Sequence, residues 1–227
     1  MENKKNNIKR VLFDTGEVVA TILDGKDLKE QIEKIHGENK ELFYLNAIAS
    51  VAGYNCKEKT DTMVFHYKEL VAISDYYGNV KTNPDSFDAE DILIVMKNKS
   101  HSSVPLATGN VIKDITAYYA LSEQIPTVIY INDDCVCYFV QCLPYVSDET
   151  LDFLEKKIAD NSLWDYLDKI EPLDQGFAEY KCDCNEEKFR EKLLTLSTED
   201  LYDLYKEGDS VEVVCQYCGK KYEISKK

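Results

Sequence analysis

The sequence predicts an α+β protein with a mixed sheet-and-helix N-terminal domain, a helical linker and a small cysteine-bearing C-terminal domain. Three observations lead to this division of the 227 residues. Residues 1–145 alternate strand-like and helix-like patterns, residues 146–178 carry an apolar stripe at helical spacing, and residues 179–227 contain two close cysteine pairs. A chain of this length can bury one main core and a small second unit.

The N-terminal domain is predicted to begin with a β-hairpin. Two apolar runs, at residues 8–13 and 18–23, flank the turn-forming residues 14–16. Two helical patterns follow, and each ends at a glycine, Gly37 for the first and Gly53 for the second.

The rest of this domain is predicted to be mostly strands. Short strands with turns between them are expected over residues 61–98, where residues 92–96 are expected to be the most clearly buried run. A helix is expected over residues 112–122, and two strands, 127–131 and 135–143, are expected to close the domain.

The linker is predicted to begin at Ser147, which suits a helix N-cap because acidic Asp148 and Glu149 follow it. Apolar residues recur at helical spacing from Leu151 onwards, until Pro172 ends the pattern. An isolated helix of this kind is marginal in water, so its apolar stripe is expected to pack on the N-terminal domain.

The C-terminal domain is predicted to contain two helices and two strands. One helix is expected over residues 186–196, and Ser197 suits the cap of a second helix, which stops by Gly208. The strands are expected at residues 211–214 and 221–224, on either side of a cysteine-bearing turn.

The charge balance argues against nucleic acid and membranes as partners. The formal net charge is -15, which repels phosphate backbones and anionic lipids. There is no apolar run long enough to span a bilayer, and the N-terminus lacks the apolar stretch of a signal peptide. We therefore expect a cytoplasmic protein, in which the eight cysteines stay reduced and are available to bind metal.

Two cysteine pairs have spacings typical of a zinc site. Cys215 and Cys218 are separated by two residues and followed by Gly219, while Cys182 and Cys184 are separated by one. Zinc prefers four thiolate or imidazole ligands in a tetrahedron, so these four cysteines are predicted to bind one zinc ion per chain. Such a zinc can be a permanent structural element, or it can be released when each close pair oxidises to a disulfide.

The C-terminal cysteine pattern resembles that of the Hsp33 family of redox-regulated chaperones. The resemblance rests on the Cys-X-Cys pair at 182–184, the 30-residue spacer, and the Cys-X-X-Cys-Gly sequence at 215–219 followed by Tyr222. Residues 109–127 are also similar to a family helix that ends in Ser-Glu-Gln-X-Pro, and residues 141–144 resemble the Gln-X-Leu-Pro sequence that closes the family's first domain.

The resemblance implies an N-terminal chaperone core domain, a helical linker and a C-terminal zinc-binding redox switch. It implies that oxidation joins Cys182 with Cys184 and Cys215 with Cys218, expels the zinc and destabilises the linker. The exposed surface then holds unfolded client proteins without ATP, and the active form is a homodimer. Under this interpretation the chain is not an enzyme.

The sequence departs from the family at two places in the N-terminal domain. This domain is shorter than usual, and residues 65–70 stand where the family has a glycine-rich loop. Val136 and Cys137 replace paired glycines before the Gln-X-Leu-Pro match.

The remaining chemically reactive residues are expected to have structural roles. Four cysteines are interpreted as small core residues, with 135 and 137 on one strand face and 142 on the other: Cys56, Cys135, Cys137 and Cys142. Three scattered histidines have no ligand at metal-binding spacing: His36, His66 and His101. Ser122 is interpreted as part of a helix end, because no partnered histidine is evident.

Two other functions remain open from the residues alone. One is a zinc-ribbon interaction module with a permanent structural zinc, which would bind a partner through four nearby residues: Tyr217, Lys220, Lys221 and Tyr222. The other is a zinc enzyme, which ranks last because four thiolates leave no open coordination position.

Overall fold

The structure, a computed structural model, describes residues 5–84, 91–98, 100–206 and 208–226. The chain divides into two compact units, Met1–Tyr180 and Lys181–Lys227. Within the described ranges, no helix combines the length and the apolar character needed to cross a bilayer.

The first unit contains an antiparallel sheet with the strand order β10-β1-β2-β9-β8 among its described residues. The strands are β1 (Ile8–Leu12), β2 (Val18–Asp24), β8 (Thr127–Ile131), β9 (Val136–Cys142) and β10 (Pro172–Gly176). The predicted opening hairpin is confirmed, because β1 and β2 pair from Ile8 opposite Leu23 to Leu12 opposite Val19. The two predicted closing strands are confirmed as β8 and β9.

A second antiparallel sheet in this unit has the order β5-β4-β3-β6-β7. Its described strands are β3 (Thr62–Tyr67), β4 (Leu70–Asp75), β5 (Val80–Asn83), β6 (Ile92–Lys97) and β7 (Ser100–Pro105). The short strands predicted over residues 61–98 are confirmed, apart from residues 85–90, which lie outside the described residues. The prediction that residues 92–96 are the most clearly buried run was wrong, because alternate side chains of β6 point to opposite faces of the sheet and only Leu93 and Val95 are buried. Strand β7 was not predicted, because its Ser-rich sequence lacks the apolar alternation of a strand.

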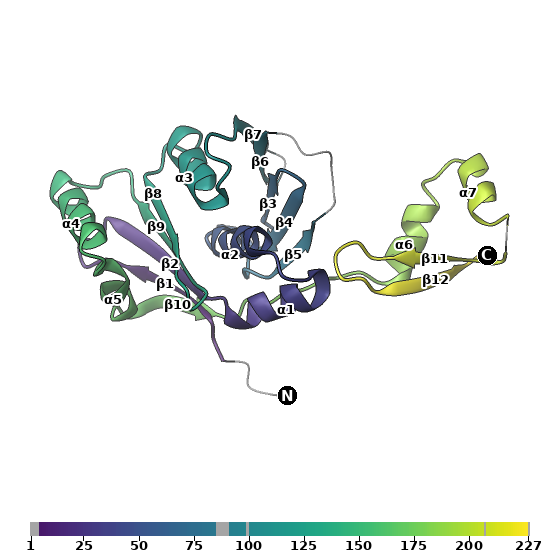
Figure 1. Cartoon of the computed structure of the whole chain (residues 1–227), viewed down its shortest axis with the longest axis horizontal. Helices are drawn as coiled ribbons and strands as arrows, with labels where there is room; N and C mark the ends of the chain where they lie inside the picture. The colour runs from purple at the N-terminus through teal and green to yellow at the C-terminus, as the bar shows by residue number, and fades with distance from the viewer. Residues whose placement is uncertain (1–4, 85–90, 99, 207, 227) are drawn as a thin grey trace. The chain divides into compact units, whose positions relative to one another are not determined.

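Five helices accompany these sheets within the described part of the first unit. They are α1 (Lys26–His36), α2 (Lys40–Tyr54), α3 (Val111–Leu121), α4 (Asp148–Ala159) and α5 (Leu163–Asp168). Helix α2 lies between the two sheets (Figure 1), where Ile48 packs in one core with Phe65 of β3 and Phe139 of β9. Its buried residues lie on several sides of the helix, because a helix between two sheets meets apolar neighbours on several sides.

The segment predicted as a helical linker is helical only as far as Asp168. Helices α4 and α5 lie on the face of the first sheet opposite α2 (Figure 1). Residues 172–176 then form β10, which pairs with β1 at the edge of the sheet. The sequence did not indicate this strand, because its pairing partner lies more than 160 positions away and Pro172 and Gly176 are poor strand formers.

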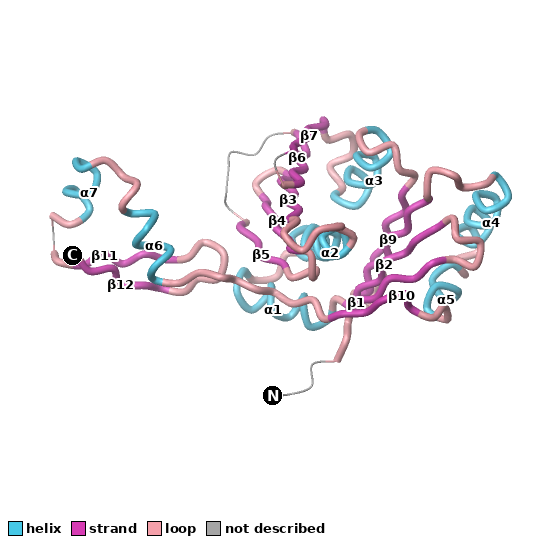
Figure 2. The backbone as a smooth tube through the Cα atoms, turned by 180° about the vertical axis from the view of Figure 1, so that it is seen from behind, coloured by secondary structure: helices cyan, strands magenta, loops and turns pink. Residues whose placement is uncertain are grey.

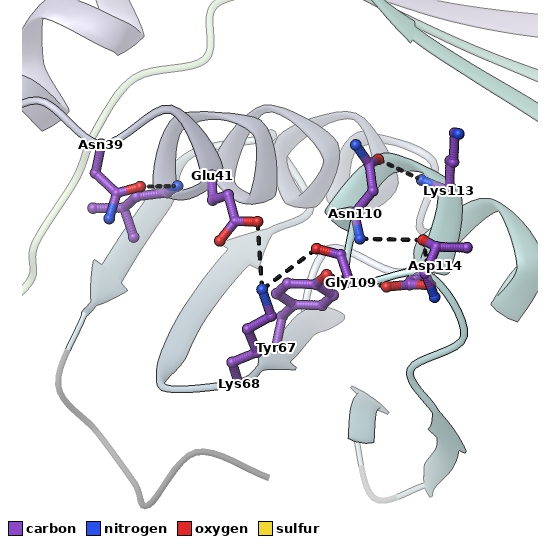
Figure 3. A network of polar contacts seen from close by, with 10 residues as sticks. Asn39, Glu41, Tyr67, Lys68, Gly109, Asn110, Lys113 and Asp114 are labelled. Atoms are coloured by element: carbon purple, nitrogen blue, oxygen red, sulfur yellow. Dashed lines mark hydrogen bonds and ion pairs between the residues drawn. The ribbon is translucent and has the colours of Figure 1, made fainter. Parts of the chain in front are cut away.

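Residues 65–70 form the turn end of the hairpin between β3 and β4. Lys68 takes a left-handed conformation there, with φ of 54°, which non-glycine residues seldom adopt. Its Nζ lies 3.5 Å from Glu41 Oε1 and 3.4 Å from the carbonyl oxygen of Gly109 (Figure 3). The adjacent Tyr67 hydroxyl donates to the buried Asp114 carboxylate at 3.0 Å. These contacts link the hairpin to α2 and α3, and the turn of the hairpin itself contains no glycine.

The described residues of the second unit form two helices and a β-hairpin. The elements are α6 (Glu186–Leu193), α7 (Thr198–Leu204), β11 (Ser210–Val214) and β12 (Lys221–Ser225). The predicted first helix ends three residues early, at Leu193 rather than residue 196. Ser197 caps α7 as predicted, because its side chain accepts a hydrogen bond from the Asp200 amide.

Candidate metal centre and covering segment

The four C-terminal cysteines lie on two loops of the second unit. Cys182 and Cys184 precede α6, while Cys215 and Cys218 lie in the turn between β11 and β12. This turn is closed by two backbone hydrogen bonds of 2.8 Å, one from the Cys215 amide to the Lys220 carbonyl and one from the Gly219 amide to the Cys215 carbonyl. Gly219 has φ of 69°, a conformation that glycine adopts without strain.

The four sulfur atoms converge on one point. All four Sγ atoms lie within 4.8 Å of one another. The Sγ atoms of Cys182 and Cys215 are 3.7 Å apart, and those of Cys184 and Cys218 are 3.3 Å apart. A tetrahedral zinc with bonds of ~2.3 Å places its sulfur ligands about 3.8 Å from one another. The donor atoms and their spacing therefore fit a four-thiolate metal site.

Neighbouring side chains fix the two loops. The Asn185 side chain caps α6 by accepting from the Lys188 amide at 2.8 Å, which orients the chain just after Cys184. The Tyr222 hydroxyl lies 3.1 Å from Cys184 Sγ and 3.0 Å from its carbonyl oxygen. The Tyr222 ring packs on Phe189, with centroids 5.2 Å apart. Tyr222 thus joins β12, α6 and the first cysteine pair.

The thiols differ in acidity because their surroundings differ. Burial raises the pKa of Cys182. Burial also opposes ionisation of Cys184, but hydrogen bonding with the Tyr222 hydroxyl and with Cys218 outweighs it and lowers the pKa of Cys184 to about 7. A zinc ion stabilises the thiolate form of every cysteine that it binds.

The second unit has little apolar core apart from this site. Among its described residues only Cys215 and Ile224 are buried. So small a unit buries too little apolar surface to be stable alone, and proteins of this kind commonly depend on a metal or on disulfides. The fold of the second unit is therefore expected to depend on the four sulfurs being held together.

The other candidate residues belong to the first unit. Cys137 and Cys142 are buried on opposite faces of the first sheet, which confirms the predicted alternation. Cys56 is buried as predicted, whereas Cys135 is only partly buried and has φ of 65° in the turn before β9. Ser122 is the C-cap of α3, as expected of a helix end.

Residues 148–176, which comprise α4, α5 and β10, form what we call the covering segment. Its leucines at 154, 163 and 167 are buried against one face of the first sheet, where Val140 and Cys142 of β9 also lie. Trp164 stacks on Tyr130, with ring centroids 4.3 Å apart and an interplanar angle of 18°. The covering segment therefore shields an apolar sheet face from water.

Polar contacts hold both ends of the α4–α5 region. At the start, the Glu17 carboxylate accepts hydrogen bonds from the hydroxyls of Ser147 and Thr150 at the N-terminus of α4. These bonds lower the pKa of Glu17. Near the end, the Tyr138 hydroxyl donates to Asp168 at 3.0 Å. Sequence reasoning missed Glu17 because its partners lie about 130 positions away.

The chain between β10 and the cysteine cluster is also anchored to the first unit. The Asn7 side chain both donates to and accepts from the backbone of Ala178, at 2.9 and 2.8 Å. The Tyr180 amide donates to the Gln31 side chain at 2.8 Å, and the Tyr180 hydroxyl is 3.0 Å from His36 Nε2. Tyr180 is two positions before Cys182. The anchored segment thus ends immediately before the first sulfur of the cluster.

Comparisons with known proteins agree on one family. The model of the family described as Hsp33 protein matches residues 3–225. The 33 kDa chaperonin of Agathobacter rectalis is 30% identical, over 70% of this chain and 72% of the relative. That of Thermotoga maritima is 34% identical, over 57% of this chain and 53% of the relative, so this match spans about half of the relative's length.

A solved structure has the same fold. The crystal structure of the 33 kDa chaperonin (heat shock protein 33 homolog) from Thermotoga maritima aligns with a TM-score of 0.76 and 22% sequence identity. The alignment covers 98% of this chain and 96% of that one.

Proposed function

Because the chain belongs to the Hsp33 family, we propose that it is a redox-regulated, ATP-independent holdase. It binds unfolded proteins under oxidative stress and prevents their aggregation, without catalysing a reaction. The observation that carries this proposal is the convergence of four sulfurs within 4.8 Å of one another, just after the anchored end of a segment that covers an apolar sheet face.

The resting form holds one zinc ion per chain through Cys182, Cys184, Cys215 and Cys218. The zinc supplies one chemical effect when bound, which is to keep the four sulfurs as thiolates, the form that oxidants attack. Each of the two loops carries two of the four cysteines. Loss of one sulfur therefore also disturbs the other cysteine on the same loop and weakens the whole unit. The near absence of other buried side chains in this unit supports the dependence.

Activation begins with oxidation of the two close pairs, Cys182 with Cys184 and Cys215 with Cys218. In each pair two thiolates give two electrons to a peroxide and form one S–S bond, while the peroxide takes up two protons and leaves as two waters. Sulfurs joined in this way no longer serve as thiolate ligands. The second unit then loses the contacts that its fold depends on.

The covering segment transmits this change to the first unit. Tyr180, the last anchored residue, is two positions from Cys182, so motion of the oxidised loop acts directly on the anchor. Release of α4 and α5 uncovers the sheet face that contains Val18, Ile22 and Val140. An apolar surface of this kind binds the exposed apolar segments of unfolding proteins.

We propose the same functional division as the sequence suggested. Residues 1–145 form the chaperone core domain, residues 146–178 form a linker whose covering part is switchable, and residues 179–227 form the zinc-binding redox-switch domain. The protein acts in the cytoplasm, and its oxidised form is a homodimer. The net charge of -15 helps to keep a client-loaded complex in solution and disfavours nucleic acid as a partner.

The test follows zinc and holdase activity in the same samples. Peroxide with mild heat is expected to release one zinc per chain, measured with a chromophoric chelator, and to suppress light scattering by an aggregating model client. Cys135→Ser is the matched control, because this half-buried cysteine lies outside the cluster and its loss leaves the response unchanged. Zinc release without holdase activity refutes the proposal. Retention of zinc, with salt-dependent binding to nucleic acid, favours a zinc-ribbon interaction module instead.

A further inference from the structure

Strand β10 occupies the edge of the first sheet beside β1 (Figure 2). The two strands are antiparallel, with Ile8 opposite Gly176 and Arg10 opposite Asp174. On its other side β1 pairs with β2 along its whole length. The covering segment therefore also supplies the strand that closes this edge of the sheet.

Little side-chain burial holds β10 in place. All five of its residues are at least partly exposed, and Leu173 is 59% exposed. Asp174 makes two side-chain contacts, an ion pair in which the Arg10 guanidinium binds its carboxylate, with Nε 3.0 Å from Oδ2, and a hydrogen bond with Tyr54 of α2. The backbone pairing with β1 adds hydrogen bonds that place little demand on sequence.

Strand β1, in contrast, is fixed in the sheet without β10. Ile8 is buried in the core that contains α2, and Val11 is buried in the core on the opposite face. Loss of β10 would leave β1 in position with a row of unpaired N–H and C=O groups, which is a template for another strand.

We propose that, in the activated protein, the β1 edge vacated by β10 binds an extended segment of the unfolded client by strand addition. This inference rests on the proposed function, because it requires the covering segment to detach. The preferred client segment carries an acidic residue opposite Arg10, where Asp174 lies in the resting form. The activated protein then binds the client at two places. The apolar sheet face contacts the client's side chains, and the β1 edge pairs with the client's backbone.

A labelled peptide with the sequence of residues 170–178 is the direct probe. It should bind the oxidised, zinc-free protein and not the reduced, zinc-loaded protein, as measured by fluorescence anisotropy. The peptide with lysine in place of the aspartate should bind at least about tenfold more weakly, because it loses a charge-assisted hydrogen bond. The protein itself stays unaltered in this comparison.

Two N-methylated peptides distinguish strand addition from other docking modes. Alternate amides of a strand point toward its neighbour and away from it. N-methylation of one alternate set should therefore abolish binding, while methylation of the other set should leave it within about twofold. Equal effects of the two sets would overturn the proposal, even if the protein is a working holdase.

Reduced, carboxymethylated α-lactalbumin, a permanently unfolded protein without thiols, tests the link to clients. Excess unmethylated peptide should displace it from the oxidised protein. If the peptide binds in the alternating manner but displaces no client, and instead dissociates a dimer seen by sedimentation, the occupant of the edge is β10 of a second copy and the client assignment is wrong. If the oxidised protein binds neither peptide nor α-lactalbumin, the proposed function itself fails.

Discussion

Replacing Leu167 by alanine should detach the covering segment without any oxidant. Leu167 is completely buried between α5 and the sheet, and it belongs to the first unit rather than to the cysteine cluster. The variant is therefore expected to bind unfolded client while its zinc is still in place. This outcome would separate the covering function from the redox chemistry.

The size of the effect follows from the burial. Truncation of a fully buried leucine to alanine costs about 2 to 5 kcal/mol. Since 1.4 kcal/mol corresponds to about a factor of ten, the detached population should rise at least roughly 30-fold. The loss should appear as local detachment, because a separate core around α2 holds the two sheets together.

Two residues report on the covering segment. Trp164, the one tryptophan of the chain, stacks on Tyr130 and should shift its fluorescence emission to longer wavelength when α5 leaves. Cys142 is buried beneath the segment, and this burial raises the pKa of its thiol. Detachment should therefore speed the alkylation of Cys142, followed by site-resolved mass spectrometry. Cys137, on the opposite face, should stay protected and serves as the internal control.

Leu173→Ala is the matched control variant. It removes the same atoms from the same segment, but Leu173 is 59% exposed, so its effect should be within about 0.5 kcal/mol. The packing argument is refuted if the Leu167 and Leu173 variants label Cys142 at the same rate. If the Leu167 variant exposes Cys142 yet binds no client, the uncovered sheet face is not the client surface.

Three further predictions concern the cysteine cluster and the Glu17 contact. Cys215→Ser should lower the zinc content after dialysis against a chelator from one per chain to near zero and unfold the second unit, measured by metal analysis and amide exchange. Tyr222→Phe removes the hydroxyl beside Cys184 and should weaken zinc binding about 10- to 100-fold, measured by chelator competition. The lowered pKa of Glu17 means that its contribution is fully present above the ordinary value of 4.5 and is lost as the pH falls through the lowered pKa. Glu17→Gln should therefore favour detachment at neutral pH, and the difference from the unaltered chain in Trp164 emission should vanish in acid.

Local patterns predicted most of the fold because most elements are specified by their own residues. The cap at Ser147 is an example, since its acceptor and donor are three residues apart. Strand β10 shows the opposite case. Its sequence contains a proline and a glycine, and it becomes a strand only because β1 offers an edge more than 160 positions away. Pairing over such a separation leaves no periodic signal in the sequence.

The candidate site likewise has one part that the sequence predicted and one part that it did not. Cysteine spacing alone predicted which four sulfurs converge, because each pair lies on a short turn that aims two side chains at one point. The sequence did not indicate the contact between Tyr180 and Gln31. The two residues are 149 positions apart, and neither belongs to a motif. The convergence of the four sulfurs was therefore predictable from the sequence, whereas the anchored residues between the covering segment and Cys182 required the structure.

Under the proposed function, release of the covering segment is coupled to loss of its helices. Helix α4 has 12 residues and α5 has six, and isolated helices of these lengths are marginal in water. Detachment is therefore an order-to-disorder transition, in which each freed residue regains about 1–2 kcal/mol of backbone conformational entropy at 25 °C. The buried leucines and the polar contacts at Glu17 and Asp168 oppose this gain in the resting form. Because the entropic contribution grows with temperature, heat acts in the direction in which the proposed oxidation would act.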